Sequence, residues 1–243
     1  DGGYYAIYLD SDNTSSSPTG LEISGNTITD TYGGIYAEYF DAPTIQGNTI
    51  KGSYMTNHGI YLAYCDVANI QGNTIKGSGT YSGAGISLNY CDGANVIEDN
   101  TIYAPDMTYG IYLNYCEATS GSEATIVNNL ISAGDYGIYL HNYNKYYNIY
   151  YNSVKVLNNN ALYYYINPEN IILKNNIFYS ASSSSPALYV NNTTGFTGDY
   201  NDLYSEYAYP IYYSNGNKTL NIYQASGQGE HSVELDPVYN TDS

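Results

Sequence analysis

The stretch Gly59–Gly77, GIYLAYCDVANIQGNTIKG, is one unit of a repeat that runs through most of the chain. Its first half contains a hydrophobic-Tyr-hydrophobic triplet that recurs, with drift, at spacings of 23 to 28 residues. The triplets begin at Ile7, Ile35, Ile60, Ile86, Ile111, Ile138, Leu162, Leu188 and Ile211. Its second half places an Asn before a short apolar segment, and these asparagines are Asn26, Asn48, Asn73, Asn100, Asn129, Asn152, Asn176 and Asn201.

The repeat unit has the pattern of short strands and turns. It combines β-branched and aromatic alternation with Gly and Asn turns, and no apolar run has the 3.6-residue period of a helix. One unit per coil gives a parallel β-solenoid, in which alternation turns Ile60 and Leu62 inward and Tyr61 outward. We therefore predict one all-β solenoid of about nine rungs over residues 1–214. Residues 215–243 have lost the repeat and are expected to cap its end.

The GIYL and GNTI halves resemble the right-handed parallel β-helix repeat proteins over about residues 4 to 213. This broad superfamily includes pectate lyases and many bacterial surface proteins. Residues 220–239, LNIYQASGQGEHSVELDPVY, together with DYNDLY at 199–204, resemble the closing segment of secreted bacterial β-helix proteins, although Tyr223 stands where Trp is expected. The resemblance implies a right-handed fold. It leaves function open, because enzymes, adhesins and fibres share these repeats.

The charge of the chain excludes some partners. There are 23 acidic residues against six lysines, and the formal net charge is −17 at pH 7. This balance argues against nucleic acid as a partner, and no window approaches the roughly 18 apolar residues that membrane insertion needs. The chain starts at Asp1 without a signal peptide. We expect a processed or excised piece of a longer secreted protein, extracellular or at the cell surface.

Tyrosine is the most abundant candidate for function, with 35 residues in the chain. Eight of the nine triplets carry it at the outward position, and Ser87 occupies the ninth. These tyrosines are Tyr8, Tyr36, Tyr61, Tyr112, Tyr139, Tyr163, Tyr189 and Tyr212. Such a stripe of rings is suited to stack on sugar faces, to accept another subunit, or simply to stabilise the sheet.

Two further columns follow the triplets. Carboxylates at Asp41, Asp66, Asp92 and Glu117 come directly after Phe40 or a cysteine. Stacked carboxylates repel, so calcium is a candidate ligand, although each acid is equally suited to cap a turn. The cysteines Cys65, Cys91 and Cys116 are one repeat apart, which excludes a CxxC metal site. We expect a buried ladder of reduced thiols, with a disulfide between adjacent rungs as the alternative.

The Asn column is predicted to be structural. Asn tolerates unusual backbone angles at a bend, and its amide can bond to the rungs above and below. The threonines Thr27, Thr49, Thr74 and Thr101 form one short column, too short to favour ice binding. Lys51 and Lys76 also share one column and are the only evident basic pair.

Catalytic signatures are hard to find. The chain has no Arg to serve as a lyase base, and the DD and GHG motifs of polygalacturonase-like enzymes do not occur. The third motif of those enzymes, NTD, occurs once, at residues 240–242, outside the repeats. Glu98 with Asp99, and Asp199 near Asp202, are the nearest candidates for paired acids. The histidines His58, His141 and His231 occupy different motif positions.

We therefore predict a noncatalytic structural and binding module of a secreted or cell-surface protein. It would serve as an adhesin stalk or filament subunit, engaging a polysaccharide or cell-surface glycan through the tyrosine stripe. No cofactor is required, calcium being the one candidate, and homopolymerisation through exposed ends is a further prediction. A polysaccharide lyase or glycoside hydrolase of the β-helix type is the alternative.

Overall fold

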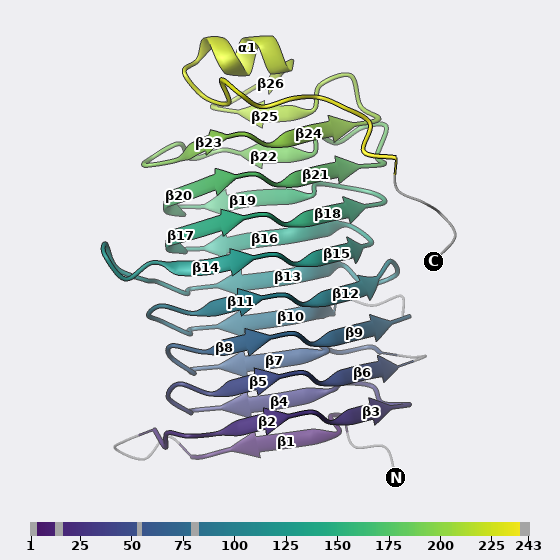
Figure 1. Ribbon diagram of the computed structural model, residues 1–243, viewed down its shortest axis with the longest axis vertical. Helices are drawn as coiled ribbons and strands as arrows, with labels where there is room; N and C mark the ends of the chain where they lie inside the picture. Colours follow the sequence, from purple (N-terminus) through teal and green to yellow (C-terminus); the bar gives the residue numbers. More distant parts are fainter. Residues whose placement is uncertain (1–3, 13–16, 53–54, 79–82, 239–243) are drawn as a thin grey trace.

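The structure is a computed structural model that describes residues 4–12, 17–52, 55–78 and 83–238. Three parallel sheets run along the solenoid, and each complete coil contributes one strand to each sheet (Figure 1). The strands nearer the viewer run to the right and those behind run to the left while the chain rises, so the coil is right-handed. The predicted right-handed parallel β-helix is confirmed, with eight complete coils in the described residues.

Sheet 1 contains β1 (Ile7–Asp10), β4 (Ile35–Glu38), β7 (Ile60–Ala63), β10 (Ala84–Asn89), β13 (Tyr109–Asn114), β16 (Tyr136–Asn142), β19 (Leu162–Ile166), β22 (Leu188–Val190), β25 (Ile211–Tyr213) and the antiparallel β26 (Asn217–Lys218). Sheet 2 contains β2 (Glu22–Ser24), β5 (Thr44–Gln46), β8 (Asn69–Gln71), β11 (Val96–Glu98), β14 (Ala124–Val127), β17 (Lys145–Tyr150), β20 (Glu169–Lys174) and β23 (Thr197–Asp199). Sheet 3 contains β3 (Thr27–Thr29), β6 (Thr49–Gly52), β9 (Thr74–Gly77), β12 (Thr101–Ala104), β15 (Leu130–Ala133), β18 (Ser153–Val156), β21 (Ile177–Ser180) and β24 (Asp202–Ser205).

The register of the sheets turns each repeated position into a column. Ile60 pairs with Ile86 and Tyr61 with Ser87, so equivalent triplet positions lie side by side in neighbouring coils. Ile60 and Leu62 are fully buried while Tyr61 is partly exposed. The apolar columns of all three sheets meet inside the coil and form one continuous core. Burial of this core supplies the main driving force for the fold.

The Asn column forms the bend between sheets 2 and 3. Asn73 donates from Nδ2 to Oδ1 of Asn100 in the next coil (3.0 Å) and to the carbonyl oxygen of Ile45 in the previous coil (2.8 Å). Its backbone N–H also donates to Oδ1 of Asn100 (3.0 Å). The same side-chain bond between successive asparagines runs from Asn26 to Asn201 and joins neighbouring coils.

The glycine of the GIYL motif marks a close approach of two coils at the start of sheet 1. A Cβ atom on Gly110 would lie 2.6 Å from the carbonyl oxygen of Gly137 and 2.4 Å from Cγ2 of Ile131. Any larger residue there would push neighbouring coils apart. The motif therefore begins with Gly for steric reasons.

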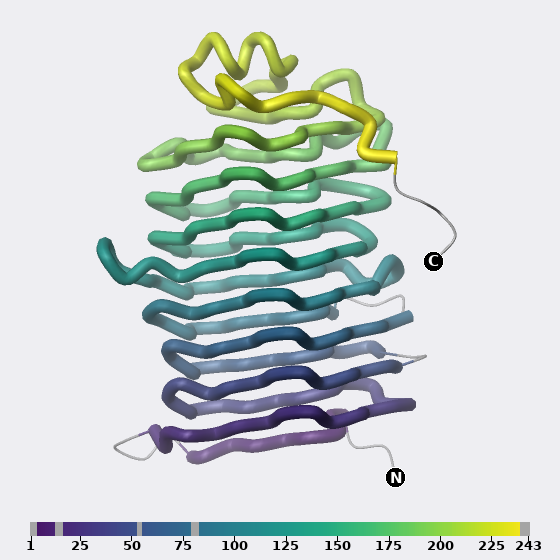
Figure 2. The backbone as a smooth tube through the Cα atoms, in the orientation of Figure 1, coloured from purple at the N-terminus to yellow at the C-terminus, as the bar shows by residue number. Residues whose placement is uncertain are grey.

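The C-terminal segment covers the end of the coil. β26 pairs antiparallel with β25, and the short helix α1 (Leu220–Ala225) follows it. Figure 2 shows the chain then passing back over the last coil. Tyr223 of α1 is buried against the core, and its ring meets that of Tyr213 edge-on at 5.3 Å between ring centroids. Of the predicted capping segment, residues 239–243 lie outside the described part of the chain.

Candidate functional site

The outward face of sheet 1 carries the predicted tyrosine column. Tyr36 and Tyr61 stack with their ring centroids 5.0 Å apart and a 12° angle between the ring planes. The longest unbroken stack runs through five rings, with centroid separations of 5.6, 5.0, 4.4 and 4.2 Å along the chain. These rings are Tyr112, Tyr139, Tyr163, Tyr189 and Tyr212. The whole outward column of sheet 1 contains eight tyrosines, and we call it the tyrosine face. Its members are Tyr8, Tyr36, Tyr61, Tyr112, Tyr139, Tyr163, Tyr189 and Tyr212.

The rings of the tyrosine face stand on edge. Their separations match the spacing of the strands, about 4.8 Å, and neighbouring planes are nearly parallel, so each ring covers the face of the next. What the column presents to a ligand is ring edges and hydroxyl groups. Stacking of sugar rings on exposed phenol faces, one of the binding modes considered from the sequence, therefore does not suit the interior of the column. Hydrogen bonding of a ligand to the row of tyrosine hydroxyls does suit this arrangement.

Ser87 divides the tyrosine face into two parts. It pairs with Tyr61 on one side and with Tyr112 on the other, yet it is fully buried. Its hydroxyl has no hydrogen-bond partner among the described residues. The position of the missing ring is therefore closed over and does not form an open slot.

Polar side chains beside the tyrosine face hold several of its hydroxyls. Tyr36 donates to the carboxylate of Glu38, and Asn89 Nδ2 donates to the hydroxyl of Tyr61 (3.1 Å). The Tyr112 hydroxyl lies 2.8 Å from Nδ1 of His141. Burial lowers the pKa of His141, which favours the neutral imidazole there. The hydroxyls of Tyr36, Tyr61 and Tyr112 are therefore oriented before any ligand arrives.

A second tyrosine column lies at the corner between sheets 1 and 2. Its members stack at centroid separations of 4.9 to 5.5 Å and have left-handed backbone φ angles between 45° and 62°. They are Tyr39, Tyr64, Tyr90, Tyr115 and Tyr143. We call this second column the corner stack, and it was not predicted from the sequence. Its signal was the Tyr that directly precedes Phe40 and each cysteine.

Ionisation of the tyrosine face should be coupled to unfolding. Burial, followed by the neighbouring Tyr109, raises the pKa of Tyr112 to about 12. Burial also raises the pKa of Tyr139 and of Tyr163. Because the unfolded phenol ionises near pH 10, the stabilisation is complete below that pH and is lost as pH rises above it. We expect the part of the tyrosinate absorbance that comes from these three rings to increase in one cooperative step, which coincides with loss of the β-sheet circular dichroism signal. Gradual ionisation with an unchanged dichroism signal would contradict this coupling.

The carboxylate column binds the backbone of the following coil. Oδ1 of Asp66 accepts the N–H of Asp92 (2.8 Å), and Oδ1 of Asp92 accepts the N–H of Glu117 (2.8 Å). Glu117 forms an ion pair with Lys145 (3.0 Å). Burial raises the pKa of Asp66, and the nearby Asp92 and Asp41 carboxylates add to the effect. These hydrogen bonds are of the kind expected if each acid caps a turn. Calcium binding at this column stays a prediction.

The cysteine column is buried and reduced. All three thiols are free and fully buried. Cys65 donates to the carbonyl oxygen of Ala63 (3.2 Å), and Cys91 donates to that of Asn89 (3.4 Å). Burial raises the pKa of Cys65 to about 11. The three thiols therefore lie in the apolar core as a column of unbonded side chains.

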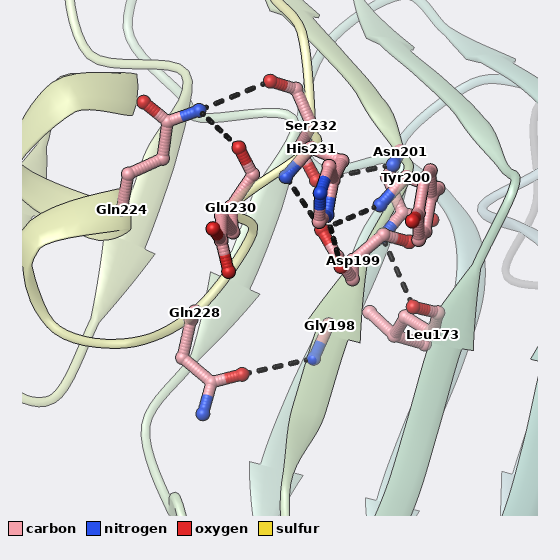
Figure 3. Close-up of polar contacts among 10 residues, drawn as sticks. All are labelled: Leu173, Gly198, Asp199, Tyr200, Asn201, Gln224, Gln228, Glu230, His231 and Ser232. Atoms are coloured by element: carbon pink, nitrogen blue, oxygen red, sulfur yellow. Dashed lines mark hydrogen bonds and ion pairs between the residues drawn. The ribbon is translucent and has the colours of Figure 1, made fainter.

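Three of the four acids considered for catalysis make structural contacts. Asp199 holds the capping segment, accepting the backbone N–H of His231 (2.8 Å) and contacting its Nδ1 (2.9 Å), as Figure 3 shows. Asp202 Oδ1 accepts the N–H of Leu235 (2.9 Å), and Glu98 accepts a hydrogen bond from Gln71 Nε2 (3.0 Å). These contacts give structural roles to Asp199, Asp202 and Glu98.

The three histidines lie in three different environments. His58 is largely buried, stacks on Tyr61 and accepts the N–H of Ala84 at Nδ1 (3.1 Å). Burial lowers its pKa to about 4. His141 lies beside Tyr112, and His231 lies in the cap. Within residues 4–12, 17–52, 55–78 and 83–238, no group of three or more His, Cys, Asp or Glu side chains is arranged to hold a metal ion.

The fold, its ladders and its register define a right-handed parallel β-helix repeat protein. Over residues 1–121, just under half of the chain, the sequence matches the family described as Periplasmic copper-binding protein (NosD). The search of curated proteins and the search of solved structures found no match. Among the described residues, no helix is long and apolar enough to cross a membrane.

In the part of the chain that the structure describes, the side chains do not fit a copper site. Copper favours thiolate, thioether and imidazole ligands. Burial raises the pKa of the Cys65 thiol, which disfavours the thiolate. The two methionines, Met55 and Met107, are buried on either side of Gly77 as part of the core.

Proposed function

We propose that this protein is a noncatalytic structural and binding module located outside the cytoplasmic membrane. In this proposal the tyrosine face binds a polysaccharide or a cell-surface glycan. The observation that carries it is the row of stacked rings, which repeats an oriented phenol hydroxyl from coil to coil. The name of the matched family, which describes its members as periplasmic, supports the location.

The chemistry of the tyrosine face suits a glycan. A phenol hydroxyl both donates and accepts a hydrogen bond, as sugar hydroxyls do. Because the rings are held by stacking, little side-chain entropy is lost when a ligand binds. A glycan that lies along the solenoid axis would meet equivalent groups about every 4.8 Å. Many modest contacts of this kind suit a long, regular polymer.

An adhesin stalk is the form of the proposal that the fold favours over an end-to-end filament. A filament that continues the coil requires an open edge at both ends. The capping segment covers the C-terminal edge through Gly229 N–H to Gly198 O (2.6 Å) and Val233 N–H to Asn201 O (2.8 Å). Polymerisation stays a prediction, and this covered edge argues for lateral contacts if it occurs.

Removing hydroxyls from the tyrosine face tests the proposal while preserving the rings. The quadruple variant carries Phe in place of Tyr112, Tyr139, Tyr163 and Tyr189. We expect it to lose about tenfold or more in affinity for a bound glycan, since a lost hydrogen bond costs about 0.5–1.5 kcal/mol. The measurement is a glycan array followed by isothermal titration calorimetry on the glycans that bind.

The corner stack supplies the matched control. A variant with Phe at Tyr39, Tyr64, Tyr90 and Tyr115 loses the same number of hydroxyls and should bind as the parent protein does. Equal affinity of both variants for every glycan would refute binding through the tyrosine face. Release of reducing ends or unsaturated products from the glycans would instead identify a lyase or glycoside hydrolase.

A further inference from the structure

The outward face of sheet 3 differs from the rest of the molecule near its N-terminal end. On β3, β6, β9 and β12 one outward column is made of threonines, Thr27, Thr49, Thr74 and Thr101. The adjacent outward column contains Thr29, Lys51, Lys76 and Tyr103, paired in that order from coil to coil. We call these two columns together the lysine face.

The charge of the lysine face is opposite to that of the chain. The protein has 23 acidic residues and only six lysines, yet two of the six are neighbours here. No outward position of these four strands carries a carboxylate. Neither Lys51 nor Lys76 takes part in the ion pairs found in the described part of the chain. Like charges on directly paired residues repel, and an anion between them would relieve that repulsion.

Tyr103 offers what the tyrosine face lacks. It pairs with Lys76, is 47% exposed, and makes no ring contact with another described residue. Its aromatic face is therefore free, whereas the rings of sheet 1 cover one another. A free ring beside two ammonium groups suits a ligand that combines a flat, partly apolar body with an anionic group.

These side chains line one hollow. It has a volume of about 470 Å³, and its lining includes Lys51, Lys76, Tyr103 and Thr29. Asp30 is the only carboxylate residue in that lining, and it follows directly after β3. It disfavours an anion at the β3 end of the hollow. The part of the hollow that favours an anion is therefore the part lined by Lys51 and Lys76, with Tyr103 beside it.

We propose that the lysine face binds an acidic saccharide. An anionic group on the sugar lies between the Lys51 and Lys76 ammonium groups, and a pyranose ring packs on Tyr103. The neighbouring threonine hydroxyls hydrogen-bond to the sugar hydroxyls. This inference rests on the proposed role in glycan binding, but it assigns a different face and a charged class of sugar. A uronate carboxylate and a sulfate ester both supply the required anion.

The test uses three chondroitin octasaccharides in isothermal titration calorimetry. One carries carboxylates alone, one carries carboxylates and sulfates, and one is desulfated and carboxyl-reduced and therefore neutral. The variants are Lys51→Gln with Lys76→Gln, and separately Tyr103→Ala. The control, Lys174→Gln with Lys218→Gln, changes the net charge equally on β20 of sheet 2 and β26 of sheet 1, outside the sheet that carries the hollow.

We expect both acidic probes to bind the parent protein, with affinity falling as salt increases. The Lys51→Gln, Lys76→Gln variant should bind the acidic probes about twofold to thirtyfold more weakly than the parent. Tyr103→Ala should weaken binding about twofold to tenfold. The control should bind as the parent does. Stronger binding of the sulfated probe would identify sulfate as the preferred anion, and equal binding would identify the carboxylate.

Equal binding of the neutral probe, or unchanged affinity in the groove variants, would overturn the inference. The tyrosine-face variant of the previous section separates the two proposals. If its glycan binding is lost while acidic probes still bind, the two faces act independently. If acidic probes fail while the tyrosine face still binds neutral glycans, only the lysine face is refuted.

Discussion

Replacing Asn129 by Ala is expected to destabilise the protein by about 3–5 kcal/mol. Asn129 lies in the middle of the asparagine ladder and is 1% exposed. Its Nδ2 donates to the carbonyl oxygens of Ile97 (2.9 Å) and Val127 (3.0 Å) and to Oδ1 of Asn152 (2.9 Å). Its Oδ1 accepts both the backbone N–H and Nδ2 of Asn100 (3.0 Å each). Alanine would leave several of these buried groups without partners.

The first rung of the same ladder supplies the control for this variant. Asn26 is exposed and donates from Nδ2 only to Ser24 O (3.1 Å) and Asn48 Oδ1 (3.0 Å). We expect Asn26→Ala to cost about 1 kcal/mol. Urea unfolding followed by circular dichroism gives both free energies. Similar losses for the two variants would show that burial of the ladder is not what makes it stabilising.

The ladder also shows how much of the fold the sequence could predict. A parallel solenoid places every repeated residue directly above its predecessor, so a period in the chain is a column in space. The Ile columns, the Asn ladder and the cysteine column follow from that one rule. Their physical reasons, an apolar interior and a bend that consumes amide groups, are contained in the repeat unit itself.

The end of the ladder could not be predicted in the same way. Asn201 is the last asparagine of the ladder. Its backbone N–H donates to Oγ of Ser232 (3.1 Å), so the serine hydroxyl takes the place of a further Asn side chain (Figure 3). Ser232 belongs to the capping segment, which contains the antiparallel strand β26 and the helix α1 and carries no repeat. The repeat predicts the ladder as far as Asn201, but it cannot predict Ser232, which completes the ladder.

The candidate site was predictable in position but not in geometry. Alternation correctly placed the eight tyrosines outward on one sheet, because it depends only on the period of a strand. It could not say that Tyr163 and Tyr189 stack at 4.4 Å with their edges toward solvent, since that depends on side-chain torsions. The corner stack was missed for a related reason: its tyrosines have left-handed backbone angles that interrupt the alternation.

Replacing Tyr223 by Ala is expected to open the C-terminal end of the β-helix. Tyr223 is 1% exposed and lies close to Gly198 and Gly229, and its ring meets Tyr213 edge-on. Removal of a buried aromatic side chain costs about 3–5 kcal/mol. Its hydroxyl has no hydrogen-bond partner among the described residues, so we expect Tyr223→Phe to be neutral or slightly stabilising. The ring, and not the hydroxyl, would then hold the cap.

The neighbouring Ile222 distinguishes loss of the cap from damage to α1. It is 53% exposed on the same helix, and Ile222→Ala should cost less than about 1 kcal/mol. Hydrogen exchange is the decisive measurement, because local opening precedes global unfolding. In the Tyr223→Ala protein the amides of Gly229 and Val233, which pair with Gly198 and Asn201, should exchange at least about tenfold faster, while the Asn129 rung keeps its protection.

An uncovered edge of β23 and β24 is also a template for pairing with another chain, so the same variant should self-associate in sedimentation experiments. Unchanged protection of Gly229 and Val233 would mean that backbone pairing alone fixes the cap and that Tyr223 only fills space.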